Sequence, residues 1–320
     1  MSITKRFFSQ WQNWLGLFIV AAFILTAIFA STLAPINAEG QDEIAVSFLK
    51  IPKPPGPGEP LGTLPDQSSV YDALIWGTQD ALKFGVGVTA IIFFVGTLIG
   101  TLAAFLGGTS NSILMWTTDM FLAFPVIAGV VFFNQLNNVM LANLVSNSEF
   151  AGFPLDYLEK FGYLKDFFPL LSPFLKLNPA AVTFALFLWV PYARVMNASV
   201  MRLKHVEYVL AAKVSGVKSF RVIFRHLIPN AIAPVLVMAA KDVGALVVMQ
   251  TTFAFIGLGN STPWADALLS GRDWIYSPNG IVTYWWVFLP VTIALILFGI
   301  GWNLLGDGLI EAMNPRSVQN

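Results

Sequence analysis

Long stretches without a charged residue are the feature that most constrains how this chain can fold. Six of these stretches follow one another along its 320 residues. A helix needs roughly 20 apolar residues to cross a hydrocarbon core of about 30 Å. The uncharged stretches are residues 7–38, 84–118, 120–148, 177–193, 243–265 and 274–306. They predict an all-α integral membrane protein with about six transmembrane helices, near residues 14–35, 82–107, 116–140, 179–200, 230–256 and 283–306.

The composition excludes several other classes of protein. Hydrophobic residues make up 56 % of the chain and charged residues 11 %, whereas soluble domains carry roughly twice that share of charge. The formal net charge is zero, so nothing favours nucleic acid as a partner, and membrane lipid is the expected environment. There is no cysteine, which excludes disulfides, thiolate catalysis and cysteine-ligated metals. The two histidines, His205 and His226, are too few for a histidine-rich metal site.

Basic residues near the N-terminus set the predicted orientation. Lys5 and Arg6 precede the first apolar stretch, and basic residues flank membrane spans on the cytoplasmic side. The apolar core of this stretch, residues 15–30, favours a retained membrane anchor over the alternative of a cleaved signal peptide, because it is long for a signal. Six spans then place both termini in the cytoplasm and the loops near 37–80, 142–178 and 257–282 outside.

The same pattern divides the chain into three parts. Residues 1–40 are predicted to hold the N-terminal transmembrane helix, and residues 41–80 a proline-rich outer loop. Proline fixes φ and lacks a backbone donor, so the run from Ile51 to Pro60 is predicted to be extended rather than helical. Residues 81–316 are predicted to form the main transmembrane domain, with an outer insert near 142–178 and a cytoplasmic loop near 201–229.

One polar block, residues 194–226, interrupts the apolar sequence and is predicted to be a cytoplasmic docking element. Its only acid is Glu207, and its basic residues are Arg194, Arg202, Lys204, Lys213, Lys218, Arg221 and Arg225. The apolar spacing predicts a short helix over 203–215, a turn with positive φ at Gly216, and a second short helix over 217–226. Pro229 is predicted to end that segment and to open the fifth span. A basic loop that only contacts anionic lipid is the alternative.

The order of residues in this block resembles that of a known family. The segment from Glu207 to Gly216 (EYVLAAKVSG), continued by 226–230 (HLIPN), resembles the EAA cytoplasmic loop of ABC importer permeases, more narrowly of the dipeptide/oligopeptide/nickel class. Similar blocks lie at 105–108, 119–125, 255–259, 303–309 and 314–316. The chain departs from the family at Leu210, where an acid is usual. It also departs after Leu61-Gly62-Thr63, where the family's acid, glycine and arginine are missing.

The resemblance implies a fold, partners and site residues. Such permeases are all-helical, lie in the prokaryotic inner membrane, and pair with a second permease subunit. They work with two ATP-binding subunits and an extracytoplasmic substrate-binding protein. The ATPase-coupling residues carried over are Glu207, Tyr208, Ala211, Ala212, Gly216 and Pro229. Peptides are the implied cargo, with nickel, opine-like compounds and oligosaccharides left open.

The chemistry of ATP is expected to lie outside this chain. It has no phosphate-binding loop of the G-x-x-x-x-G-K-[ST] type. We therefore expect a transport subunit that is no enzyme and binds no cofactor itself, with ATP and Mg used by the partner ATPases. A stand-alone secondary transporter and a membrane-embedded enzyme are the alternatives. The first typically has internal repeats, which this sequence lacks, and the second needs more clustered polar residues than the sequence offers.

Two adjacent charges fall inside the fifth predicted span. Lys241 and Asp242 lie roughly 18 Å beyond Pro229 at 1.5 Å per residue, near the predicted midplane of the membrane. Charged side chains at this depth are costly and usually face a water-filled path or a partner. Lys241, Asp242 and Gln250 are therefore predicted to line a translocation path. The alternatives are a structural contact to the partner permease, or a helix that starts later and leaves both charges near the membrane interface.

Overall fold

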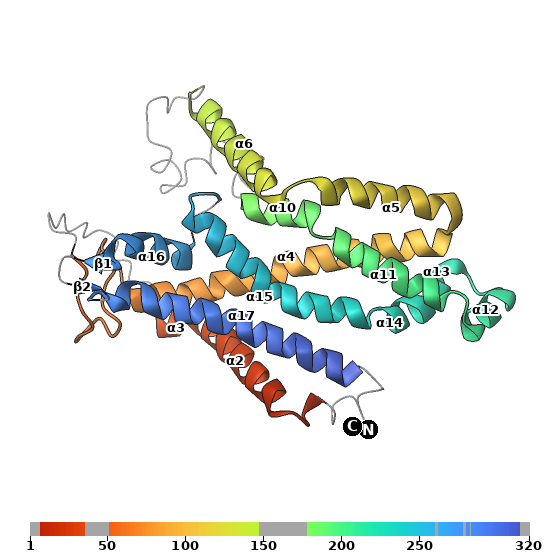
Figure 1. Ribbon diagram of the computed structural model, residues 1–320, viewed down its shortest axis with the longest axis horizontal. Helices are drawn as coiled ribbons and strands as arrows, with labels where there is room; N and C mark the ends of the chain where they lie inside the picture. The colour runs from red at the N-terminus through yellow and green to blue at the C-terminus, as the bar shows by residue number, and fades with distance from the viewer. Residues whose placement is uncertain are drawn as a thin grey trace.

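Helices make up almost the whole fold (Figure 1). The computed structural model describes residues 7–35, 51–146, 178–259, 262–277, 280–281 and 283–313. Its helices are α2 (Trp11–Ile28), α3 (Ala30–Leu33), α4 (Val70–Leu106), α5 (Gly108–Ala123), α6 (Val126–Ser146), α10 (Pro179–Phe187), α11 (Val190–Leu203), α12 (Glu207–Val214), α13 (Ser219–Val222), the π-helix η1 (Ile223–Leu227), α14 (Ile228–Ala231), α15 (Ala233–Phe255), α16 (Pro263–Gly271), the 3₁₀-helix η2 (Arg272–Trp274) and α17 (Trp285–Met313). The strands β1 (Tyr276–Ser277) and β2 (Gly280–Ile281) form one antiparallel pair. Most of the insert predicted near 142–178 lies outside the described residues.

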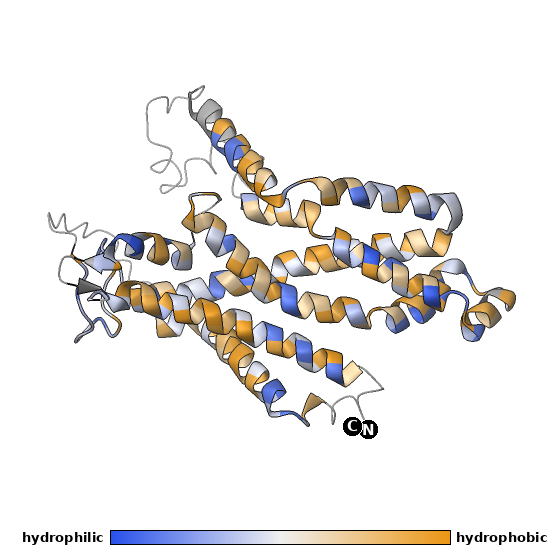
Figure 2. Cartoon of the chain, in the orientation of Figure 1, coloured by the Kyte–Doolittle hydropathy of each residue, from blue (hydrophilic) through white to orange (hydrophobic). Residues whose placement is uncertain are grey.

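The described helices provide five or six candidate membrane spans. Five stretches are long and apolar enough: α2, α4, α10 with α11, α15 and α17. The number rises to six if the bent pair α5–α6 counts as one span. Figure 2 shows mostly hydrophobic residues on these helices, interrupted by scattered hydrophilic ones. The prediction of an all-α membrane protein with about six spans is confirmed.

The third span differs from its prediction. A single helix was expected over 116–140, but α5 and α6 meet at a bend of 74°. The break falls at Phe124, which is extended (φ −84°, ψ 125°) and precedes Pro125. Proline disfavours the helical conformation in the residue before it and lacks the N–H that would continue the helix. Pro125 in the sequence therefore explains the bend, although the uncharged stretch around it predicted one continuous helix.

The second span begins earlier than predicted. Helix α4 starts at Val70 rather than near residue 82, with the Ser69 hydroxyl accepting a hydrogen bond from the Asp72 N–H at 3.4 Å. It therefore includes the last residues of the predicted outer loop 41–80. Its 37 residues extend about 56 Å at 1.5 Å per residue, which exceeds a hydrocarbon core of about 30 Å. The helix therefore continues outside the membrane, where charges such as Asp72 and Asp80 are tolerated. For this reason the uncharged stretch alone could not locate the start of α4.

Helix α4 is the central element of the bundle and packs on α2, α5, α10, α11, α15 and α16 (Figure 1). Its closest neighbour is α11, and the contact is made at glycine. A Cβ placed on Gly100 would clash with the backbone oxygen of Ala193 and lie only 2.9 Å from the Ala193 Cα. Small residues allow membrane helices to approach closely and to gain dispersion energy. The α4–α11 contact in turn fixes the side chains described below.

Candidate coupling element and its contacts in the membrane

A small helical hairpin projects from one end of the bundle (Figure 1). It consists of α12, the turn at Gly216, α13, η1 and α14, and is called the α12–α14 element from here on. Helix α11 leads into it and α15 leaves it. Strands β1 and β2 lie at the opposite end of the bundle (Figure 1). The element therefore connects the ends of α11 and α15 at one end of the bundle, where these two spans are expected to leave the membrane.

The turn at Gly216 has the predicted conformation. Helix α12 ends at Val214, and Gly216 has φ +74°, as expected for a glycine that terminates a helix. The Ser215 and Val217 N–H groups donate to the carbonyls of Ala211 and Ala212 at 2.9 and 3.1 Å. A Cβ on Gly216 would meet nothing within 4 Å. Glycine is thus required here for its backbone conformation and not for lack of space.

The segment after the turn departs from its prediction. A helix over 217–226 was expected to end at Pro229, but α13, η1 and α14 follow one another and Pro229 lies inside α14. The boundary between α14 and α15 falls later, at Ile232, which keeps helical angles (φ −74°, ψ −19°). Proline lacks an N–H, so it fits in the first turn of a new helical segment. The wider π turn of η1, in which the Ile228 N–H donates to the Ile223 carbonyl, immediately precedes it.

The α12–α14 element has a buried side and an exposed apolar side. Val209, Val222 and Leu227 are completely buried against the bundle. On the opposite side, Val214 is 89 % exposed and Phe220 71 % exposed. Large exposed apolar patches mark surfaces that contact a protein or a membrane. Of the predicted coupling residues, Glu207, Tyr208, Ala211, Gly216 and Pro229 are exposed and Ala212 is partly exposed.

The three residues predicted to line a path do not share a face of α15. The Lys241 Nζ forms an ion pair with Asp307 Oδ1 of α17 at 2.6 Å. Asp242 Oδ2 accepts a hydrogen bond from the Tyr192 hydroxyl of α11 at 2.5 Å. Gln250 is buried, and the steps of about 100° per residue in a helix place it on the side of α15 opposite Lys241. Lys241 and Asp242 thus make contacts between helices, and the structure does not bring Lys241, Asp242 and Gln250 together at one site.

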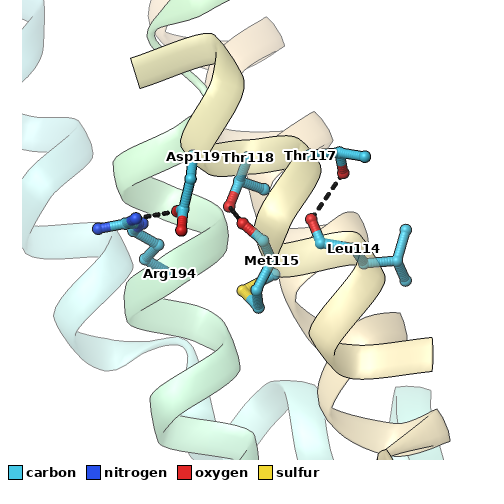
Figure 3. A network of polar contacts seen from close by, with 6 residues as sticks. All are labelled: Leu114, Met115, Thr117, Thr118, Asp119 and Arg194. Atoms are coloured by element: carbon cyan, nitrogen blue, oxygen red, sulfur yellow. Dashed lines mark hydrogen bonds and ion pairs between the residues drawn. The ribbon is translucent and has the colours of Figure 1, made fainter. Parts of the chain in front are cut away.

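Further polar contacts connect α11 to α4 and α5. Figure 3 shows the ion pair between Arg194 of α11 and Asp119 of α5, and the nearby Thr118 hydroxyl donating to its own helix. Asn197 donates to Asn111 Oδ1 of α5 at 2.6 Å, and Lys204 Nζ to the Ala104 carbonyl of α4 at 3.1 Å. The predicted docking block included Arg194 and Lys204, and the structure uses both to join helices.

Sequence reasoning missed the partners Tyr192, Asp119 and Asp307. Tyr192 and Asp242 are separated by 50 residues, and Arg194 and Asp119 by 75. The available signal was that an isolated acid in an apolar stretch needs a partner. That signal shows that a partner exists, but it does not show which helix carries it.

Comparison with known proteins agrees with this architecture. A profile of the family described as binding-protein-dependent transport system inner membrane component matches residues 96–319. A Brucella suis protein whose name assigns it to a peptide transport system as a permease is 29 % identical over 297 residues, covering 92 % of this chain and 85 % of that protein. The Bacillus subtilis dipeptide transport system permease protein DppC is 26 % identical, covering 94 % and 81 %. The oligopeptide transport system permease protein OppC of the same organism is 26 % identical, covering 97 % and 88 %. Because the profile matches more than half of the chain, the protein belongs to the family of binding-protein-dependent transport system inner membrane components.

Proposed function

We propose that this chain is the permease subunit of an ATP-driven importer. It acts with a second permease subunit, two ATP-binding subunits and an extracytoplasmic substrate-binding protein. The α12–α14 element carries this proposal, because it projects from the bundle and exposes apolar side chains such as Val214 and Phe220. A partner docked on this surface would bury them and gain the corresponding hydrophobic free energy. Family membership favours this role over a stand-alone secondary transporter.

Short peptides are the proposed cargo. The three relatives compared above are named for peptide, dipeptide and oligopeptide transport. ATP and Mg are used by the partner ATPases, and this chain provides the path and the coupling contact.

The test begins by coexpressing the chain with its genomic-neighbour permease and ATPases. The purified assembly is reconstituted with the binding protein, and ATP-dependent uptake of a radiolabelled casein hydrolysate is measured. Uptake that persists without the ATPases would contradict the proposal.

A charge placed on the exposed tip of α12 should release the ATPases. In Val214→Asp a carboxylate replaces an apolar side chain that the proposed interface buries, and an unpaired buried charge is costly. We expect copurification of the ATPases to fall by about tenfold, which corresponds to 1.4 kcal/mol. The matched control is Thr109→Asp, which adds the same charge at an exposed position of α5. Equal loss in both variants would argue against docking through α12.

Both ends of the chain are proposed to lie in the cytoplasm of a prokaryotic cell, on the side of the α12–α14 element. The chain contains no cysteine, so single cysteines can report this orientation directly. A membrane-impermeant maleimide should label Asp273→Cys in intact cells, because Asp273 lies near β1 at the opposite end. In cells that express the chain without the ATPases, Val214→Cys should react only after the membrane is permeabilised. The reverse pattern of labelling would invert the proposed topology.

The translocation path is proposed to pass the part of α15 that carries Lys241. Its side chain is 35 % exposed and that of its partner Asp307 is 57 % exposed, so the pair can face a hydrated space. Lys241→Met should lower uptake, and combining it with Asp307→Asn should leave uptake low although no unpaired charge remains. Recovery of uptake in the double variant would instead show that the pair only joins α15 to α17.

A further inference from the structure

One hydrogen bond joins the two helices that flank the α12–α14 element. The Tyr192 hydroxyl of α11 donates to Asp242 Oδ2 of α15 at 2.5 Å. Helix α11 enters the element and α15 leaves it. The bond therefore closes a loop of chain from Tyr192 to Asp242 that contains the whole element, and both residues lie within candidate membrane spans.

Tyr192 is held firmly in place for this contact. Its side chain is buried, and its ring lies edge-on to Phe93 of α4 with 6.4 Å between ring centroids. Gly96 of α4 leaves no room for a Cβ beside the Tyr192 Cβ, so the tyrosine packs directly on the α4 backbone. A phenylalanine would keep these apolar contacts and lose only the hydroxyl. The hydrogen bond can thus be removed with little change in the packing of the ring.

The neighbouring residue extends the connection to a third helix. Lys241 forms its ion pair with Asp307 of α17 at 2.6 Å, and a Cβ on Gly306 would lie 2.5 Å from the Lys241 Cγ. Adjacent residues on a helix point about 100° apart. One turn of α15 is therefore bonded to α11 on one side and to α17 on the other.

The other polar contacts of α11 point elsewhere. Arg194 and Asn197 bind α5, and Lys204 binds the α4 backbone. Without the Tyr192 hydroxyl, α11 would remain anchored in the bundle through α4 and α5. It would lose its side-chain hydrogen bond to the helix that leaves the α12–α14 element. Removal of the hydroxyl should therefore affect the coupled movement of α11 and α15 more than it affects the stability of the fold.

We propose that Tyr192 is a positioning residue for transport, which acts through Asp242 to make α11 and α15 move as one unit with the α12–α14 element. Tyr192 is buried between the helices, where water has little access to compete for its hydrogen bond, so we expect the bond to persist while the helices move. A displacement of the element by the ATPases then reaches α15, and through Lys241 reaches α17. This inference rests on the proposed function and names the internal contact that the function requires.

The test is the ratio of peptide taken up to ATP hydrolysed in proteoliposomes that contain the complete importer. The probe is the radiolabelled casein hydrolysate. Tyr192→Phe should lower this ratio about fivefold, the effect of one lost hydrogen bond of roughly 1 kcal/mol. The rate of ATP hydrolysis and the recovery of all subunits should stay at the native level. The control Tyr284→Phe removes a hydroxyl near β2 and should leave the ratio unchanged.

Two variants of Asp242 identify the contact itself. Asp242→Asn keeps an oxygen that can accept from Tyr192 and should retain the native ratio. Asp242→Leu removes the acceptor and should match Tyr192→Phe, with no further loss in the double variant. A purely structural role would lower uptake, ATP hydrolysis and subunit recovery together, and that result overturns the inference.

The outcomes also separate this inference from the proposed function. If the assembly with the native chain takes up peptide but Tyr192→Phe keeps its ratio, the positioning role of Tyr192 is wrong and the importer stands. If the native assembly shows no ATP-dependent uptake, the proposed function fails and this inference fails with it.

Discussion

Gly100→Ala should destabilise the folded chain strongly. The added Cβ would clash with the backbone oxygen of Ala193 and lie 2.9 Å from its Cα. Backbone atoms in two packed helices cannot rotate away, so α4 and α11 must separate. Overpacking of this kind costs about 1–3 kcal/mol, and separation also loosens the contacts made by Tyr192 and Asn197. We expect a lower midpoint of thermal unfolding in detergent micelles, measured by fluorescence-detected size-exclusion chromatography.

Gly87→Ala on the same helix provides the matched control. A Cβ at Gly87 would meet nothing within 4 Å. Alanine is a better helix former than glycine by about 0.5–1 kcal/mol, so this variant should be as stable as the native chain or more stable. If Gly100→Ala and Gly87→Ala unfold at the same temperature, the close approach of α4 and α11 does not exist in the membrane protein.

Gly216→Val should weaken coupling strongly without removing the protein from the membrane. The positive φ of +74° at Gly216 costs about 1–2 kcal/mol for residues with a Cβ, and β-branched residues avoid it most strongly. The turn will relax to another conformation and displace α12 from its position beside α13. We expect peptide uptake to fall by about tenfold or more, since 1.4 kcal/mol corresponds to a factor of ten.

Gly216→Asn separates backbone conformation from the loss of glycine itself. Asparagine tolerates the left-handed conformation far better than valine, and there is open space for its side chain. Uptake and ATPase copurification should therefore remain close to native in this variant. Equal loss in the asparagine and valine variants, at normal membrane levels of the chain, would show that the conformation of this turn does not control coupling.

Features that depend on a few neighbouring residues could be predicted from the sequence. Uncharged stretches located α2 and most of α17, because the hydrocarbon core tolerates few charges over the length of a span. Helix α15 carries Lys241 and Asp242, and its start was predicted from Pro229 instead. The turn at Gly216 was predicted with its positive φ, because the signals for helix termination lie within a few residues. The start of α4 and the bend at Pro125 were missed for a related reason. Charge gaps report the part of a helix inside the membrane, whereas α4 extends beyond it and proline acts on the backbone without any charge.

Which side chains meet depends on how the helices pack. Lys241 and Asp242 could be recognised as costly charges, but their partners Asp307 and Tyr192 lie on helices distant in the chain. Which helices pack together depends on surfaces such as Gly96 and Gly100 of α4, where the approach of two backbones sets the position of every side chain nearby. Helices and turns follow from interactions between residues a few positions apart. The pairing of Tyr192 with Asp242 follows from the packing of three helices at once, and no local pattern contains that information.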